Sequence, residues 1–247
     1  MRLGLIGGTA MVGLAVDDLD TTRVDEVVAD TAHGDVPMTC VTLENGSELF
    51  FIQRHHGEEP TPPHKIKHRA NMKALACAGV DAIIAICSVG TIPEDFPPGS
   101  VGYATQYIDF SGRAVTYHHT RAQFTSMTAP FDAEVNAKLA EVLAELQPGL
   151  GLERTYWFTE GPQFETAAEI NAIATLGGEV VGMTMARECK LATELKIPYA
   201  AILVASNWAA GRNPDGSTVA LDHEEVSATA AERLGPVVEC IKALSND

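Results

Sequence analysis

Apolar runs of strand length alternate with stretches of helical periodicity along most of the chain, and this alternation restricts the fold more than any other feature. Residues 81–90 are predicted to form a buried strand, and the segment before them, 65–79, carries a helical pattern that ends at Gly79. The same order recurs in a predicted helix at 185–197 and a predicted strand at 198–207. Such alternation is typical of an α/β domain with a mixed, largely buried sheet flanked by helices.

The remaining predicted elements fit the same architecture. They are strands at 3–8, 48–53 and 155–162, and helices at 132–147, from about Phe164 onward, and from 222 to 244. No linker, repeat or low-complexity tract divides the sequence, so residues 1–247 are expected to form a single domain. No segment approaches the roughly 18 uninterrupted apolar residues that a membrane helix needs, and we expect no membrane partner.

Charge and cysteine usage exclude several classes of function. The formal net charge is −16, which repels nucleic acids and anionic membranes, so neither is an expected partner. The five cysteines are scattered and include no CxxC pair, which argues against a disulfide framework and against a zinc site. The apolar N-terminus is interrupted by Gly7, Gly8 and Thr9 and is better explained as a first strand than as a signal peptide. The expected location is cytoplasmic.

Each predicted strand ends in a cluster of polar or small residues. The clusters are Gly7-Gly8-Thr9, Arg54-His55-His56, Cys87-Ser88-Val89-Gly90, 160–165, and Ser206-Asn207. In open α/β folds, ligands bind at the carboxyl ends of the strands. The sequence therefore predicts that these clusters meet in one site.

Several of these residue types suit an anion. The planar fork of Arg54 matches phosphate, and the two adjacent histidines add donors. Thr184 lies at a predicted helix start, where free N–H groups attract anions. Simpler explanations stay open at this stage: a solvated strand end for Arg54, a tight turn for Gly7-Gly8-Thr9, and an ordinary N-cap for Thr184.

Other chemistries find less support. Adjacent histidines at a strand end point to opposite sides, and no acid lies at ligand spacing, so a metal site is not expected. Gly7, Gly8 and Gly13 miss the spacing of a dinucleotide-binding loop. No Gly-x-Ser-x-Gly turn is present, which leaves covalent catalysis unsupported. Glu165 is most simply an acid in a first helical turn, or else a group that recognises a planar ligand together with Asn207.

The motifs together resemble the trimeric purine nucleoside phosphorylases and methylthioadenosine phosphorylases. They are IGGT, RHH followed by PPHKIKHRAN, a strand ending in SVG, EGPQFET, VVGMT and SN, and they extend from about residue 3 to the last helix. The resemblance implies the nucleoside phosphorylase fold and phosphorolysis of an N-glycosidic bond, with inorganic phosphate as co-substrate. It further implies a homotrimer that needs no metal and no organic cofactor.

The resemblance also implies roles for individual residues. The phosphate site would comprise Thr9, Arg54, His55, Cys87, Ser88 and Thr184, with His56 as the alternative histidine. The nucleoside site would comprise Met183 under the ribose, Phe164 along the purine, Glu165 at N1–H, Asn207 at O6 and N7, His223 at the 5′-hydroxyl, and Phe124 from the neighbouring subunit. The implied catalytic residues are Asn207 and His55. Two departures from the family pattern are Ala10 and the absence of the usual proline before Glu188.

Glu165 and His223 carry the expected substrate specificity. A glutamate needs a proton on N1, which a 6-oxopurine has and adenine lacks, so inosine or guanosine in purine salvage is expected. S-methyl-5′-thioinosine is the alternative, because the segment from RHH to HRAN is closer to the methylthio branch. The competing hypotheses are a dinucleotide-dependent oxidoreductase or nucleotide-binding module, a metal-dependent nucleoside hydrolase and a non-catalytic purine-binding trimer.

Overall fold

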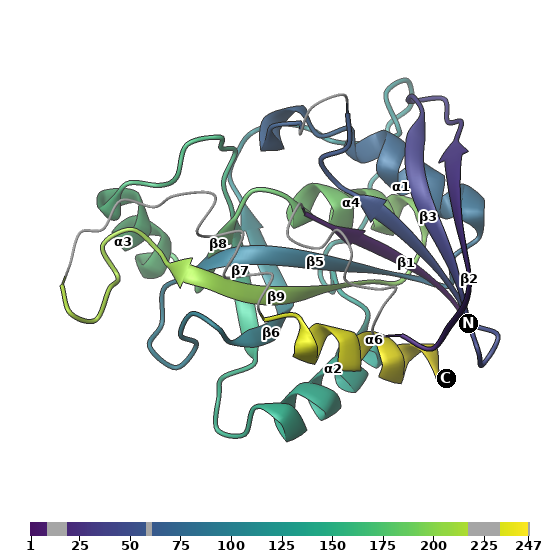
Figure 1. The fold of residues 1–247 in the computed structure, drawn as a ribbon. Coiled ribbons are helices and arrows are strands. Elements are labelled where there is room, and N and C mark those ends of the chain that lie inside the picture. Colours follow the sequence, from purple (N-terminus) through teal and green to yellow (C-terminus); the bar gives the residue numbers. More distant parts are fainter. Residues whose placement is uncertain (9–18, 58–60, 217–232, 247) are drawn as a thin grey trace.

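A sheet of nine strands forms the centre of the computed structural model, which describes residues 1–8, 19–57, 61–216 and 233–246; the strands are counted within these ranges (Figure 1). The strands are β1 (Arg2–Gly7), β2 (Thr21–Ala29), β3 (Val36–Leu43), β4 (Glu48–Gln53), β5 (Ala82–Thr91), β6 (Val101–Asp109), β7 (Glu153–Phe158), β8 (Val180–Gly182) and β9 (Tyr199–Trp208). Their order is β2-β3-β4-β1-β5-β8-β7-β6-β9. The mixed α/β fold expected from the sequence is confirmed.

Part of the sheet closes on itself. β5 pairs with β8 at Gly90 and Thr91, and it also pairs with β9 in parallel along most of its length. Strands β5, β8, β7, β6 and β9 therefore form a ring, while β1, β4, β3 and β2 extend from β5 as an open arm. Because β1, β4, β5 and β9 run parallel in neighbouring positions, their carboxyl ends point the same way.

Helices cover the sheet on two sides. They are α1 (His68–Ala78), α2 (Ala133–Leu146), α3 (Ala167–Thr175), α4 (Met185–Leu195) and α6 (Gly235–Ser245), with a short 3-10 turn at Pro63–Lys65. Helices α1 and α4 lie together on one face, and α2 and α6 lie together on the other (Figure 1). Helix α3 stands apart and packs on Trp157 and Val181. No helix within the described ranges is long and apolar enough to cross a membrane.

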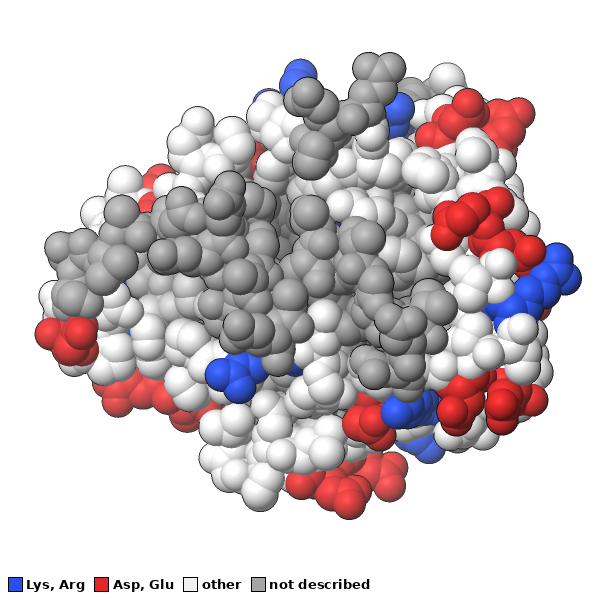
Figure 2. Space-filling view, viewed as in Figure 1, with Lys and Arg blue, Asp and Glu red and all other residues white. Residues whose placement is uncertain are grey.

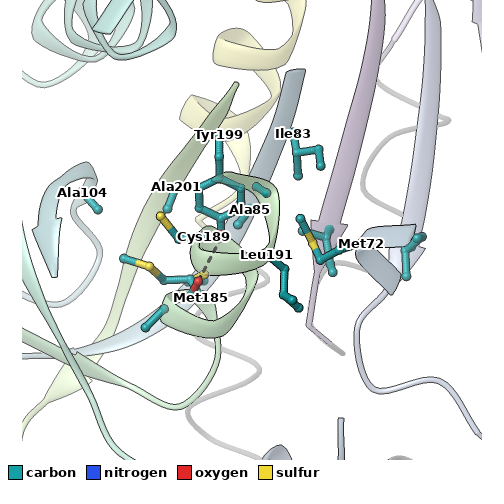
Figure 3. Packing of buried hydrophobic residues seen from close by; sticks show 14 of the residues in the cluster. Met72, Ile83, Ala85, Ala104, Met185, Cys189, Leu191, Tyr199 and Ala201 are labelled. Carbon is teal, nitrogen blue, oxygen red and sulfur yellow. Dashed lines mark hydrogen bonds between the residues drawn. The ribbon is translucent and has the colours of Figure 1, made fainter. Parts of the chain in front are cut away.

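The alternation of side chains along β5 builds both cores. Ile83 and Ala85 face α1 and α4, whereas Ile84 and Ile86 face α2 and α6. Figure 3 shows Met185, Cys189 and Leu191 of α4 among the side chains of β5 and β9 in the first of these cores. A strand buried on both faces needs an unbroken apolar run, which is why its position was predictable.

Helix ends follow local signals. Asp132 caps α2 by accepting from the backbone N–H groups of Glu134 and Val135, and Gly79 ends α1 in the left-handed conformation that glycine favours. The expected helix start near Phe164 is wrong: Thr166 and Glu169 form a capping box, so α3 begins at Ala167. Glu165 therefore precedes the helix, and the acid in its first turn is Glu169.

The sequence prediction omitted β2, β3, β6 and β8. Strand β2 is an edge strand whose residues are mostly exposed, so it lacks the hydrophobic alternation that identifies a strand. Strand β8 spans only Val180–Gly182 and exists because β7 and β5 pair with it. The part of the expected last helix that precedes residue 233 lies outside the described residues.

Leu139→Ala should destabilise the fold by about 2–5 kcal/mol, because Leu139 of α2 is fully buried against the second core and its loss leaves a cavity. Leu146→Ala on the same helix is the matched control, since Leu146 is exposed. It should change the unfolding free energy by about 0.5 kcal/mol or less. Urea unfolding of both variants measures the difference, and equal losses would contradict the assigned core.

Candidate active site

The carboxyl ends of β1, β4 and β5 bring three of the polar clusters together. Gly7 lies opposite Gln53 on one side and Ile86 on the other. The backbone N–H of Arg54 donates to the carbonyl of Gly7 at 2.7 Å. On β5, Ser88 is exposed although its neighbours are buried, so its side chain faces open space at this end of the sheet.

Arg54 is almost fully buried, with 2% of its surface exposed, and its guanidinium is held by protein groups. Its Nε and Nη2 donate to the two carboxylate oxygens of Glu188. Nη2 also donates to the Ile6 carbonyl at 3.1 Å, and Nη1 donates to the Ile86 carbonyl at 3.2 Å. The alternative explanation of Arg54 as a solvated strand end is therefore excluded. Nη1 keeps one N–H without a partner among the described residues, and it lies 4.0 Å from the position that a Cβ on Gly8 would occupy.

Glu188 is the centre of a buried polar cluster. Its side chain has no exposed surface, and besides Arg54 it accepts from the Tyr199 hydroxyl at 3.2 Å. The Nδ1 atom of buried His68 lies 3.7 Å from it. Burial by itself would raise the pKa of Glu188, but the charge of the adjacent Arg54 and its two hydrogen bonds outweigh burial and lower that pKa to about 2. Burial lowers the pKa of His68, so its imidazole is neutral at pH 7.

Thr184 lies at the N-terminus of α4 but does not cap it. Its side chain makes no capping bond, its N–H donates to the Tyr156 hydroxyl at 3.1 Å, and its hydroxyl lies 3.8 Å from the Cys87 sulfur. That sulfur is 3.7 Å from Nη2 of Arg54, so Thr184 and Arg54 flank Cys87. Burial raises the pKa of Cys87 to about 11, which keeps it a thiol at neutral pH. The first backbone N–H groups of α4 have no side-chain cap, and an uncapped helix start suits an anion.

The two adjacent histidines have different partners. His55 Nδ1 lies 2.6 Å from the Thr61 carbonyl, so Nδ1 carries the proton and Nε2 has no partner among the described residues. His56 Nε2 lies 2.7 Å from Asn71 Oδ1, and the Asn71 amide donates to the Arg54 carbonyl. His56 is therefore tied to α1, whereas His55 keeps a ring nitrogen for a ligand. Burial lowers the pKa of His55.

The loop between β7 and α3 carries the residues expected to read a base. The Thr159 hydroxyl donates to Glu165 Oε1 at 2.6 Å. Phe164 is exposed beside it. Gly161, which has a positive φ of 65°, lies directly against Met183: a Cβ at this position would overlap the methionine sulfur. The Met183 side chain therefore contacts this loop, and the next residue along the chain is Thr184 at the start of α4.

Asn207 lies near the end of β9, opposite Gly90 of β5. The Ser206 hydroxyl donates to its Oδ1 at 2.8 Å, and its Nδ2 donates to the Trp208 carbonyl at 2.9 Å. Each of these atoms has a second hydrogen-bonding position for a ligand.

Three expected site residues do not join this group in the described structure. Phe124 is 97% exposed, so it is not packed against the other candidates of its own chain. Thr9 and His223 lie outside the described residues. Within the described ranges, no group of three or more His, Cys, Asp or Glu side chains is placed to hold a metal ion.

Sequence reasoning also missed residues that hold the site. Arg187, which stands where the family pattern has proline, pairs with Glu160 and lies over the Phe158 ring, 5.0 Å from its centre. Glu160 also pairs with Arg113 at 2.9 Å. His68, Asn71 and Thr159 form comparable supporting contacts. Their only sequence signal was proximity to the motifs, because the contacts join segments far apart in the chain.

Comparison with known proteins identifies the family. The phosphorylase superfamily model matches residues 2–242. The chain belongs to the phosphorylase superfamily. The resemblance carried by the motifs is confirmed, and the protein is an enzyme of the nucleoside phosphorylase type, a pentosyltransferase.

Relatives within the superfamily cover almost the whole chain. The sequence is 35% identical to the 6-oxopurine nucleoside phosphorylase of Pyrococcus furiosus over 98% of this chain and 91% of the relative. It is 33% identical to a probable S-methyl-5′-thioinosine phosphorylase of Methanothermobacter thermautotrophicus over 99% of this chain and 84% of the relative. The crystal structure of methylthioadenosine phosphorylase from Schistosoma mansoni in complex with adenine shares the fold, with a TM-score of 0.85 at 22% identity, covering 100% of this chain and 91% of that one.

Glu188→Gln should lower the unfolding free energy at pH 7 by about 3–5 kcal/mol, because it leaves the Arg54 charge buried without its partner. Glu239→Gln is the matched control. Glu239 pairs with Lys242 on the surface of α6, and its loss should cost about 1 kcal/mol or less.

The stability difference between wild type and Glu188→Gln should also depend on pH. The folded-state pKa of Glu188 is about 2, below its ordinary value of 4.5, so its stabilising contribution is complete above pH 4.5 and is lost as the pH falls toward 2. The loss is on the order of 3 kcal/mol. Urea unfolding at pH 7 and pH 3 should therefore show a smaller difference between wild type and Glu188→Gln at the lower pH. A difference that does not depend on pH would contradict the assignment.

Proposed function

We propose that the protein cleaves the N-glycosidic bond of 6-oxopurine nucleosides with inorganic phosphate, giving the free base and ribose 1-phosphate in purine salvage. The observation that carries this proposal is the position of Met183. Met183 directly precedes Thr184 at the N-terminus of α4, and its side chain packs against Gly161 of the loop that bears Glu165. A sugar over Met183 would have phosphate on one side and the base on the other, as phosphorolysis requires.

The part of the proposed site near the N-terminus of α4 would hold phosphate without a metal ion. Its donors are the free N–H groups of the first turn of α4, the hydroxyls of Thr184 and Ser88, and the remaining Nη1–H of Arg54, with Thr9 added from the family pattern. Cys87 contributes by packing between Thr184 and Arg54. Neutral His55 would accept from the hydroxyl of monoprotonated phosphate through Nε2. Arg54 also acts indirectly, by anchoring α4 through Glu188.

The part of the proposed site formed by the loop before α3 and by Asn207 would recognise a 6-oxopurine. Glu165 keeps Oε2 as an acceptor for N1–H, and Phe164 offers an exposed ring to the purine face. Asn207 would donate to O6 or N7 and so stabilise negative charge on the departing base. Opposite charges develop on sugar and base in such a transition state, so phosphate below the sugar and Asn207 at the base act together.

The two candidate substrates differ at the 5′ position of the nucleoside, which carries either a hydroxyl or a methylthio group. Identity to the 6-oxopurine and to the methylthioinosine relatives is nearly equal, at 35% and 33%. His223 would favour a 5′-hydroxyl, and on that basis inosine or guanosine is our first choice. S-methyl-5′-thioinosine is the second, which would yield hypoxanthine and 5-methylthioribose 1-phosphate.

The proposal extends to assembly. The family pattern implies a homotrimer in which Phe124 enters the ribose site of the neighbouring subunit, and its 97% exposure leaves the ring available for that contact. A cytoplasmic location and a single domain over residues 1–247 remain predictions.

A substrate panel tests the proposed reaction. Inosine or guanosine should be cleaved only when phosphate is present, and adenosine and methylthioadenosine should be poor substrates, because Glu165 cannot accept from an unprotonated N1. A coupled assay of base release, with and without phosphate, measures this. Cleavage that persists without phosphate would indicate a hydrolase, and a preference for methylthioinosine would select the second substrate.

The two histidines provide a matched pair of variants. His55→Ala should lower kcat/KM for phosphate by about 100-fold, because it removes a group at the anion. His56→Ala should leave this constant within about threefold but destabilise the fold by about 1–3 kcal/mol, since Asn71 Oδ1 is left buried and unpaired. Phosphate saturation curves and urea unfolding separate the two effects. The reverse pattern would assign the phosphate contact to His56.

A further inference from the structure

Thr159 makes the closest contact to the acid that is proposed to read the base. Its hydroxyl donates to Glu165 Oε1 at 2.6 Å, the length expected of a hydroxyl bonded to a charged acceptor. The Gly182 carbonyl, at 3.5 Å, is a much weaker acceptor for the same proton. We infer that Thr159 is a specificity-determining residue that orients Glu165 toward the N1–H of a 6-oxopurine. This inference rests on the proposed function.

The backbone gives Thr159 a fixed position that Glu165 lacks. Thr159 directly follows β7, and its N–H donates to the Gly182 carbonyl at 2.9 Å, which extends the pairing of β7 with β8. Glu165 lies in the irregular segment before α3. A carboxylate on such a segment has freedom about its own side-chain bonds, and a hydrogen bond to a rigid strand end removes part of it.

The ion pairs of this loop do not involve Glu165. Arg187 and Arg113 both pair with the other acid of the loop, Glu160. Among the described residues, Thr159 is the only hydrogen-bond donor to Glu165. The two acids of this loop therefore differ in their contacts. Glu160 attaches the loop to α4 through Arg187, whereas Glu165 forms no ion pair within the described residues.

The hydroxyl also decides which oxygen is presented. With Oε1 occupied by Thr159, Oε2 is the oxygen left with its lone pairs free. An acceptor held in one orientation discriminates between a base with a proton on N1 and a base without one. A loosely held carboxylate would discriminate less, because it would turn away from an unprotonated N1 at little cost.

Thr159→Val tests the inference, since valine keeps the shape and removes only the donor; Thr159→Ser, which retains the hydroxyl, is the matched control. Isothermal titration calorimetry of hypoxanthine and adenine measures base binding separately from turnover. Thr159→Val should weaken hypoxanthine binding about tenfold and change adenine binding by less than about threefold. Thr159→Ser should stay within about threefold of wild type for both bases.

A mutant cycle separates orientation from a general structural role. In a Glu165→Gln background, Thr159→Val should have little further effect on hypoxanthine, because the group it positions is already altered. Full additivity of the two substitutions in hypoxanthine binding would overturn the inference. It would also be overturned if Thr159→Val weakened the binding of hypoxanthine and adenine equally, or if a lower urea midpoint of that variant accounted for its weaker binding.

The two proposals fail in different ways. Wild-type protein that binds hypoxanthine but releases no base from inosine, guanosine or methylthioinosine would overturn the proposed function, while the binding cycle still decides the role of Thr159. Wild-type protein that binds neither hypoxanthine nor guanine would overturn both.

Discussion

The ion pair between Arg54 and Glu188 is the contact on which the site depends. Arg54 directly follows β4, Glu188 belongs to α4, and the carboxylate also contacts Tyr199 of β9 and His68 of α1. Burying two charges is costly, and the cost is offset only when good geometry and further hydrogen bonds satisfy both groups. Here the carbonyls of Ile6 and Ile86 supply that satisfaction for Arg54. The pair thereby connects the open arm of the sheet to the helix that would bind phosphate.

Helix α4 supports three parts of the proposed site at once. Its N-terminus carries Thr184, and Glu188 points into the core. The residues at positions 187, 190 and 194 share another face, as their spacing requires. They contact Glu160 of the base loop, Asp109 at the end of β6, and residues 116 and 117 of the segment that leads to Phe124. One rigid element therefore contacts the segments that carry the proposed phosphate-binding residues, the proposed base-binding residues and Phe124.

The surface charge opposes the binding of an anion. Acidic side chains are prominent on the face seen in Figure 2, and several gather toward the side where β2 and β3 lie. A phosphate site within such a field must rely on short-range donors, because a net charge of −16 provides no attraction over distance. Backbone N–H groups at a helix start and hydroxyl groups meet this requirement, and they do not need the excess of basic residues that a nucleic-acid-binding surface shows.

The sequence by itself determined the fold class, the strand ends that carry polar clusters, and the family. Continuous apolar runs such as 81–90 identify buried strands, and the residues after them must lie at one edge of a parallel sheet. Only the tertiary structure separated His55 from His56, since their different partners, Thr61 and Asn71, lie on segments that no local pattern connects to them. It likewise showed that Arg54 is paired with Glu188, that Glu165 precedes α3, and that Thr159 reaches it. Hydrophobic periodicity records which face of an element is buried, whereas a hydrogen-bond partner depends on which elements meet, and that is decided only when the chain closes into its sheet and helices.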